Sequence, residues 1–113
     1  MVKRLPANLD ASQSRALLEQ IEPFLQSERP HLVFDFTDVR HMGSAGVEML
    51  LRCMEAAMKR NGDLKLAAVS PEQAVILEMT RVDRLFEIFD SSADAVESFH
   101  RFSTASSQSK FEE

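Results

Sequence analysis

Short apolar runs alternate with segments of helical periodicity along the chain. The clearest run is His-Leu-Val-Phe-Asp-Phe at residues 31–36. It is nearly continuous and rich in β-forming residues, as in a strand covered on both faces. Three further runs predict strands at residues 2–5, 64–69 and 85–89. Because side chains alternate along a strand, two faces are expected in the run at 31–36: Leu32, Phe34 and Phe36 on one, and Val33, Asp35 and Thr37 on the other.

Four segments of helical periodicity lie between and after these runs, and each opens with a start signal. The signals are, in chain order, Asp10 with Gln13, a turn over residues 43–46, Ser70 with Pro71 and Gln73, and Ser91 with Asp94. Pro23 is expected to kink or interrupt the first helix near its end. Asn61 and Gly62 are expected to end the second, because both tolerate the left-handed conformation of a helix C-terminus.

Strands that alternate with helices in a small domain predict the α/β fold class. We expect one domain over residues 1–102, with a four- to five-stranded, mostly parallel or mixed sheet and about four helices packed on it. Since four strands and four helices fill about 100 residues, we expect no second domain beside them. Residues 103–113 carry no periodic apolar position, and we expect them to form a mobile polar tail.

Composition narrows the class of protein. The chain has 13 basic and 18 acidic residues, a net charge of −5, which argues against nucleic acid as a partner. No apolar run approaches the roughly 20 residues of a membrane span, so no membrane insertion is expected, and no signal-peptide core is found. The one cysteine, Cys53, cannot form an intramolecular disulfide, which fits a cytoplasmic protein.

The spacing of the histidines and the cysteine supports neither a metal site nor a catalytic cysteine. His31, His41 and His100 share no ligand spacing with one another or with Cys53. Cys53 falls beside the apolar stripe of the second helix, where a cysteine usually acts as a small hydrophobe. We therefore predict no metal site, no cofactor and no cysteine nucleophile.

The segment Met-Gly-Ser-Ala-Gly at residues 42–46 joins a strand region to a helix. A hydrolase nucleophile elbow would need a glycine in place of Met42, a histidine base and a larger chain. A phosphate-binding loop would need a lysine and a further glycine. Neither pattern is complete, so an enzyme is not predicted.

Ser44 has two interpretations at this stage. It is either an N-cap, worth about 1 kcal/mol, or an exposed phosphoacceptor. The flanking Gly43 and Gly46 favour the second, because they remove side-chain bulk and allow another protein to approach closely. A phosphate would add about −1.5 to −2 charges there and repel a partner. The N–H groups of the helix N-terminus would tolerate that anion.

Five segments together resemble a known family, the STAS domain. They are Asn-Leu-Asp at 8–10, Leu-Val-Phe-Asp-Phe at 32–36, the turn at 42–46, Gly-Asp-Leu-Lys-Leu at 62–66, and the run at 81–96 with its Leu-Phe-Glu-Ile-Phe-Asp-Ser. Each motif alone is loose, but their order and spacing are fairly specific. The branch that the chain resembles most is the stand-alone bacterial anti-sigma factor antagonists, and the similarity covers about residues 5–99.

The resemblance implies partner switching in the control of transcription. In that family the unphosphorylated protein binds an anti-sigma factor serine kinase and so frees a sigma factor. The kinase phosphorylates a serine at the start of the second helix, and a cognate phosphatase removes the phosphate. The phosphoacceptor of the family's Asp-Ser-Ser-Gly turn aligns with Ser44. Gly43 and Ala45 stand where the family has the aspartate and the second serine.

The resemblance also implies a switch loop and a partner surface, formed by His41, Gly43, Ala45, Gly46, Glu48, Arg52 and Glu55. As a generic pattern, the charged positions on this helix indicate a solvated face with modest ion pairing. Asp35, at a strand end near the switch loop, is expected to support that loop by bonding to its backbone rather than to recognise a partner.

Two questions stay open in the sequence. The same fold with the same helix face also suits an unphosphorylated scaffold, or a small subunit of a transporter or lipid-trafficking complex. The family commonly has another strand ahead of the one at residues 2–5. Either the sheet has one strand fewer, or its open edge pairs with another molecule, which leaves a homodimer open.

Overall fold

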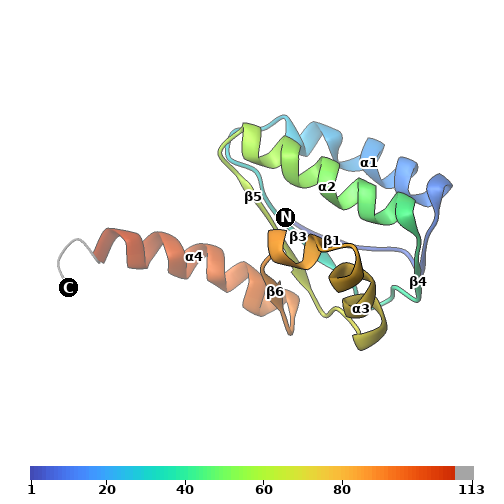
Figure 1. Cartoon of the computed structure of the whole chain (residues 1–113). Helices are drawn as coiled ribbons and strands as arrows, with labels where there is room; N and C mark the ends of the chain where they lie inside the picture. The colour runs from blue at the N-terminus through green and yellow to red at the C-terminus, as the bar shows by residue number, and fades with distance from the viewer. Residues whose placement is uncertain (109–113) are drawn as a thin grey trace.

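A four-stranded parallel sheet forms the centre of the molecule (Figure 1). The computed structural model describes the backbone of residues 1–108 and the side chains of residues 1–100. The strands are β1 (Val2–Arg4), β3 (His31–Asp35), β5 (Asp63–Ala67) and β6 (Ile88–Phe89), in the order β1-β3-β5-β6, and every neighbouring pair is parallel. The expected α/β class is confirmed, as is the expected mostly parallel sheet of four to five strands, which here has four.

A second, two-stranded sheet was not predicted. Strands β2 (Asn8–Leu9) and β4 (His41–Met42) pair in parallel. The carbonyl of Ala7 also accepts hydrogen bonds from the N–H groups of Arg40 and His41. This small sheet ties together the two segments that lead into the first and second helices.

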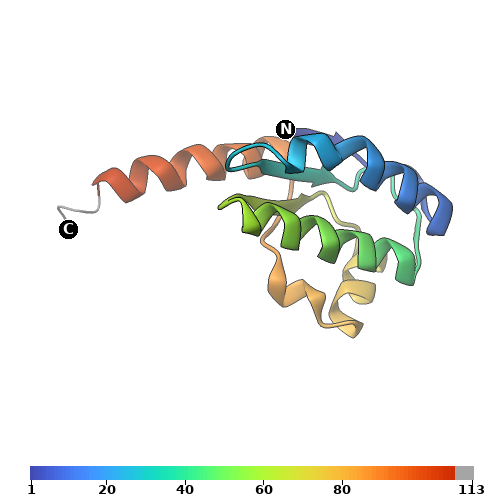
Figure 2. The same ribbon diagram turned by 90° about the horizontal axis from the view of Figure 1, so that it is seen from above.

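The helices lie on both faces of the main sheet. Helices α1 (Ala11–Leu25) and α2 (Ser44–Lys59) pack side by side on one face (Figure 1). Helix α4 (Ser92–Gln108) packs on the other and extends away from the sheet (Figure 2). Helix α3 (Pro71–Met79) and a short 3-10 helix, η1 (Val82–Leu85), connect β5 to β6.

Alternation along β3 divides the core into two clusters. Leu32, Phe34 and Phe36 belong to the larger cluster, formed with residues of α1, α2, α3 and η1. Val33 packs instead with Ala67 and with Ala95 of α4. The alternation predicted for residues 31–36 is confirmed, and the buried strand is covered on both faces.

Two local predictions need correction. Helix α1 is not interrupted at Pro23 but continues to Leu25; the missing N–H of Pro23 removes one backbone hydrogen bond near the end of the helix. Asn61 takes the left-handed conformation, with φ of 62°, whereas Gly62 does not. Gly62 is needed because a Cβ there would lie 2.1 Å from the carbonyl oxygen of Pro30.

The C-terminal third also differs from expectation. The strand predicted at residues 85–89 is reduced to Ile88–Phe89, because the residues before it form η1. Helix α4 runs to Gln108, so residues 103–108 of the expected tail are helical. The remainder of that tail, residues 109–113, lies outside the described residues. The domain boundary at residue 102 and the mobility of the tail stay predictions.

Candidate functional site

Ser44 is the first residue of helix α2, and its side chain is exposed. The N-cap interpretation of Ser44 is wrong, because Gly43 occupies the N-cap with an extended backbone (φ −94°, ψ −170°). No side chain caps α2, and its first turn holds no acidic residue. Helices α1 and α3, in contrast, begin with Asp10 and Ser70, whose side chains accept backbone N–H bonds. The Ser44 hydroxyl thus stands at an uncapped, positively polarised helix end.

The two glycines that flank Ser44 play different parts. Gly43 is exposed, and a Cβ on it would meet nothing within 4 Å. Gly46 is buried, and its Cβ would lie 2.8 Å from Met42 Cγ and 3.0 Å from Leu9 Cβ. Gly46 therefore offers no exposed surface to a partner, and its place in the switch loop stays a prediction. Gly46 lets α2 approach the small β2–β4 sheet closely.

A buried glutamine holds the loop that leads to Ser44. Gln73 of α3 is 2% exposed, and its Nε2 donates a hydrogen bond of 3.1 Å to the carbonyl oxygen of Arg40. The sequence marked Gln73 only as part of a helix start signal. Nothing in the local pattern shows that its side chain turns inward, since that depends on the loop after β3, which is distant in sequence but lies at the same edge of the sheet.

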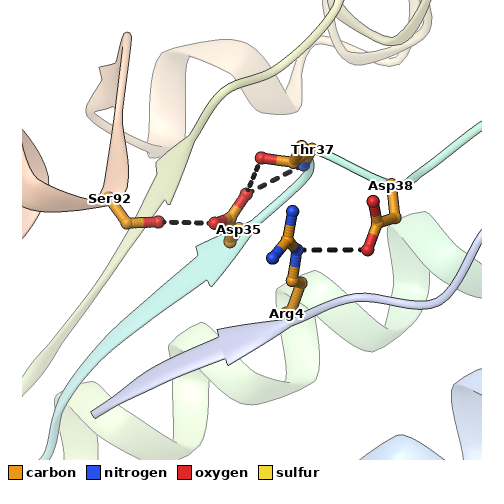
Figure 3. Close-up of polar contacts among 5 residues, drawn as sticks. All are labelled: Arg4, Asp35, Thr37, Asp38 and Ser92. Carbon is orange, nitrogen blue, oxygen red and sulfur yellow. Dashed lines mark hydrogen bonds and ion pairs between the residues drawn. The ribbon is translucent and has the colours of Figure 1, made fainter.

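Asp35 joins three parts of the chain (Figure 3). Its Oδ1 accepts hydrogen bonds from the Thr37 N–H, at 2.8 Å, and from the Thr37 hydroxyl, while Oδ2 accepts one of 2.8 Å from Ser92 Oγ. Burial alone would raise the pKa of the Asp35 carboxyl, but these hydrogen bonds and Arg4 together lower it below its ordinary value. Arg4 itself forms an exposed ion pair with Asp38, at 3.1 Å.

The bonds of Asp35 include one to loop backbone, the kind of contact expected of it. They also reach the start of α4, which the sequence did not suggest. Asp35 lies on the α4 side of the sheet, away from the α1–α2 face. Its effect on the loop before Ser44 therefore passes through the backbone at Thr37 rather than through a side chain in the site.

Of the remaining residues of the predicted partner surface, His41 lies in β4 before Ser44, and the others follow Ser44 along α2. Four of them are exposed and one, Ala45, is half-buried; the exposed ones are His41, Glu48, Arg52 and Glu55. Glu48 and Arg52 form an ion pair of 3.7 Å with both side chains about two-thirds exposed (66% and 64%). Such a pair adds little to stability. The pair also lines a shallow surface hollow, whose apolar part consists of Leu51, Met54 and Met58.

The other titratable candidates lie apart from this surface. Cys53 is buried, and burial raises the pKa of its thiol to about 12, which leaves it protonated and unreactive. His31 stacks on Phe99 of α4, with ring centroids 4.4 Å apart. Among the described residues, no cluster of three or more His, Cys, Asp or Glu could hold a metal ion. Over the same residues, no helix has the length and apolar character needed to cross a membrane.

These features define a small α/β domain with an exposed serine at the start of its second helix. A family model described as the STAS domain matches residues 1–95, and the chain belongs to that family.

Three solved structures illustrate the likeness. An anti-sigma-factor antagonist (STAS) domain protein from Planctomyces limnophilus is 22% identical, with a TM-score of 0.78 over 86% of this chain and 87% of that one. An anti-sigma factor antagonist from Mycobacterium paratuberculosis is 25% identical, with a TM-score of 0.75 over 86% and 82%. The Bacillus cell fate determinant SpoIIAA, in its phosphorylated form, is 19% identical, with a TM-score of 0.70 over 87% and 88%.

Proposed function

We propose that this protein is an anti-sigma factor antagonist, which binds an anti-sigma factor serine kinase in the cytoplasm and releases it when Ser44 is phosphorylated. The observation that carries the proposal is the position of Ser44: exposed, at the first residue of α2, at the end of a charged helix face. Membership of the STAS family and the anti-sigma antagonists among similar structures support the same role.

The proposed transfer is a simple phosphoryl exchange. Ser44 Oγ attacks the γ-phosphorus of ATP held by the kinase, forming a P–O bond while the bond to ADP breaks. The hydroxyl proton passes to a base of the kinase. A cognate phosphatase restores the hydroxyl by hydrolysis. This chain contributes no catalytic group and acts as substrate and ligand.

The local structure accounts for a switch that leaves the fold intact. A phosphate on Ser44 would extend into solvent from the uncapped end of α2, whose backbone N–H groups and dipole favour an anion. The same phosphate would place about −2 charges in the middle of a contact surface. Binding should therefore be lost by repulsion of the partner rather than by unfolding of this domain.

Intact-mass analysis tests the site. The protein is incubated with ATP and each anti-sigma kinase of the same genome in turn. We expect one added phosphate on the wild type, none on Ser44→Ala, and one on Ser12→Ala, the matched control at an exposed serine in the first turn of α1. Phosphate on the Ser44→Ala variant would overturn the assignment.

The Ser44→Asp variant tests the switch itself. We expect it to bind the kinase at least about tenfold more weakly than the wild type, as for a like charge placed in an interface. Its thermal midpoint should stay close to that of the wild type, because the residue is exposed. Full kinase binding by this variant would contradict the proposal.

Unphosphorylated protein that binds a transporter ATPase would favour the scaffold alternative, for which Gly43 and Ala45 are the supporting residues.

A further inference from the structure

A groove between α1 and α2 begins beside the switch serine. It is lined by Ala11, Ser14, Arg15, Leu18, Ala45, Glu48, Met49 and Arg52. Ala45, at one end, directly follows Ser44 in the chain. The groove thus continues the surface around Ser44 toward α1, which carries none of the residues that the sequence marked as partner-binding.

The floor of the groove contains an unsatisfied polar atom. Ser14 is 4% exposed, and its Oγ has no hydrogen-bond partner among the residues that the structure describes. Such hydroxyls are rare in folded proteins, because a buried donor without an acceptor loses its bonds to water and gains nothing in return. Ser14 Oγ is covered in this structure, so an acceptor atom that enters between the two helices would satisfy it once the side chains over it move aside.

The walls of the groove are positively charged in an otherwise acidic protein. Arg15 and Arg52 stand on α1 and α2, and Glu48 is the one acidic residue of the lining. Glu48 already forms the exposed 3.7 Å pair with Arg52, so the lining carries a net charge of +1 against −5 for the whole chain. The uncapped N-terminus of α2 adds positive potential at the Ala45 end.

We propose that this groove receives an acidic side chain of the partner protein, whose carboxylate lies between Arg15 and Arg52 and accepts a hydrogen bond from Ser14 Oγ. Guanidinium groups pair with carboxylates in this way through charge-assisted hydrogen bonds. The inference rests on the proposed function for the identity of the partner, an anti-sigma kinase. It also explains the switch, since a phosphate on Ser44 would repel a carboxylate bound next to it.

Two soluble peptides test the groove without any kinase. One is an alanine-based helical peptide with two glutamates one turn apart, and the other is its glutamine twin. In a titration of the isotope-labelled full chain followed by NMR, the glutamate peptide is expected to shift the amide signals of Ser14 and Ala45, and the twin is not. Equal shifts with both peptides, or none at these residues, would overturn the proposal.

Variants of exposed groove residues sharpen the test, because they leave the fold in place. The double variant Arg15→Gln with Arg52→Gln should bind the glutamate peptide about tenfold or more weakly than the wild type does. Glu48→Gln should bind it more tightly, because a like charge has been removed. Lys59→Gln is the matched control, a basic residue of the same helix outside the groove, and should change nothing. Unchanged peptide affinity in the double arginine variant would contradict the inference.

The kinase experiment separates the two proposals. If a kinase phosphorylates Ser44 and binds the double arginine variant as well as the wild type, the groove assignment fails and the proposed function stands. If the peptide titration succeeds but no kinase binds or modifies the wild type, the proposed function fails. The groove then remains a carboxylate site for another acidic protein.

Discussion

The two glycines near Ser44 differ in exposure, although neither has a side chain. Gly43 and Gly46 look equivalent in the sequence, as two small residues on either side of a serine. The structure assigns the first to solvent and the second to a contact with Leu9 and Met42. The exposure of Ser44 could be expected from its place at a helix start. The burial of Gly46 could not, because it depends on β2, which no sequence pattern revealed.

Substitutions at the two glycines should therefore have unequal effects. Gly46→Ala forces a Cβ against Met42 and Leu9, and overpacking of this kind costs about 1 to 3 kcal/mol, offset by roughly 1 kcal/mol of helix propensity. Gly43→Ser places a favourable N-cap in open space, so its free energy of unfolding should stay within about 0.5 kcal/mol of the wild type or rise. Urea denaturation measures both. Equal stability of the two variants would show that the Gly46 contact relaxes freely.

Asp35 should make stability depend on pH. Its pKa is lower in the folded protein than in the unfolded chain, so its contribution is present above the unfolded value of roughly 4 and is lost as pH falls through the folded value. Asp35→Asn should cost about 1 to 2 kcal/mol at pH 7, where it weakens charge-assisted bonds to Thr37 and Ser92. That difference from the wild type should shrink below about pH 4.

Thermal unfolding of both proteins between pH 7 and pH 3 measures this change. Asp38→Asn is the control, since it removes a nearby carboxylate from an exposed ion pair of small value. A difference between wild type and Asp35→Asn that stays constant over the whole pH range would contradict the role given to the charge of Asp35.

Among the helices and strands, hydrophobic periodicity predicted the long ones: helices of several turns and strands that are buried along most of their length. Strands β3 and β5 and the four helices each carry enough apolar positions for a period to be recognised, and their start signals placed the helices well. Strands β2 and β4 have two residues each, too few for any alternation to appear. These two strands pair because the packing of α1 and α2 brings together the segments that precede the two helices. The same holds for η1, whose buried Val82 belongs to a cluster formed by distant helices.

The candidate site follows the same division. The helix start with its serine and the charged positions of α2 are local features, and the sequence predicted them. The inward-turned Gln73 and the groove beside Ala45 arise only where two elements meet. The link from Asp35 to α4 spans residues 35 and 92, which no local pattern connects. A surface built by packing therefore has to be read from coordinates, even when the family is recognisable from motifs.

Over the whole of the described structure, the buried apolar side chains form two clusters of unequal size, one on each side of the sheet. The larger joins α1, α2, α3 and η1, whereas α4 rests on a small cluster around Val33, Ala67 and Ala95. A buried lysine compensates for this small area. Lys65 Nζ bonds to Ser98 Oγ of α4 at 2.7 Å, pairs with Glu87 at 3.0 Å and lies 4.3 Å from the centre of the Phe99 ring. Even with these contacts and the Ser92–Asp35 hydrogen bond, helix α4 should open more readily than the rest of the molecule, because it rests on the smaller cluster.

Lys65→Ala should release α4 without loosening the other face of the sheet. We expect the amide protons of Ala95 to Phe99 to exchange about tenfold faster or more, which corresponds to about 1.4 kcal/mol of lost local stability. Exchange in α1 and α2 should change little, because their cluster does not include Lys65. Lys59→Ala, at an exposed lysine of α2, is the control and should leave α4 unaffected. If Lys65→Ala instead accelerates exchange equally in every helix, α4 unfolds only together with the whole domain, and the two sides of the sheet form a single cooperative unit.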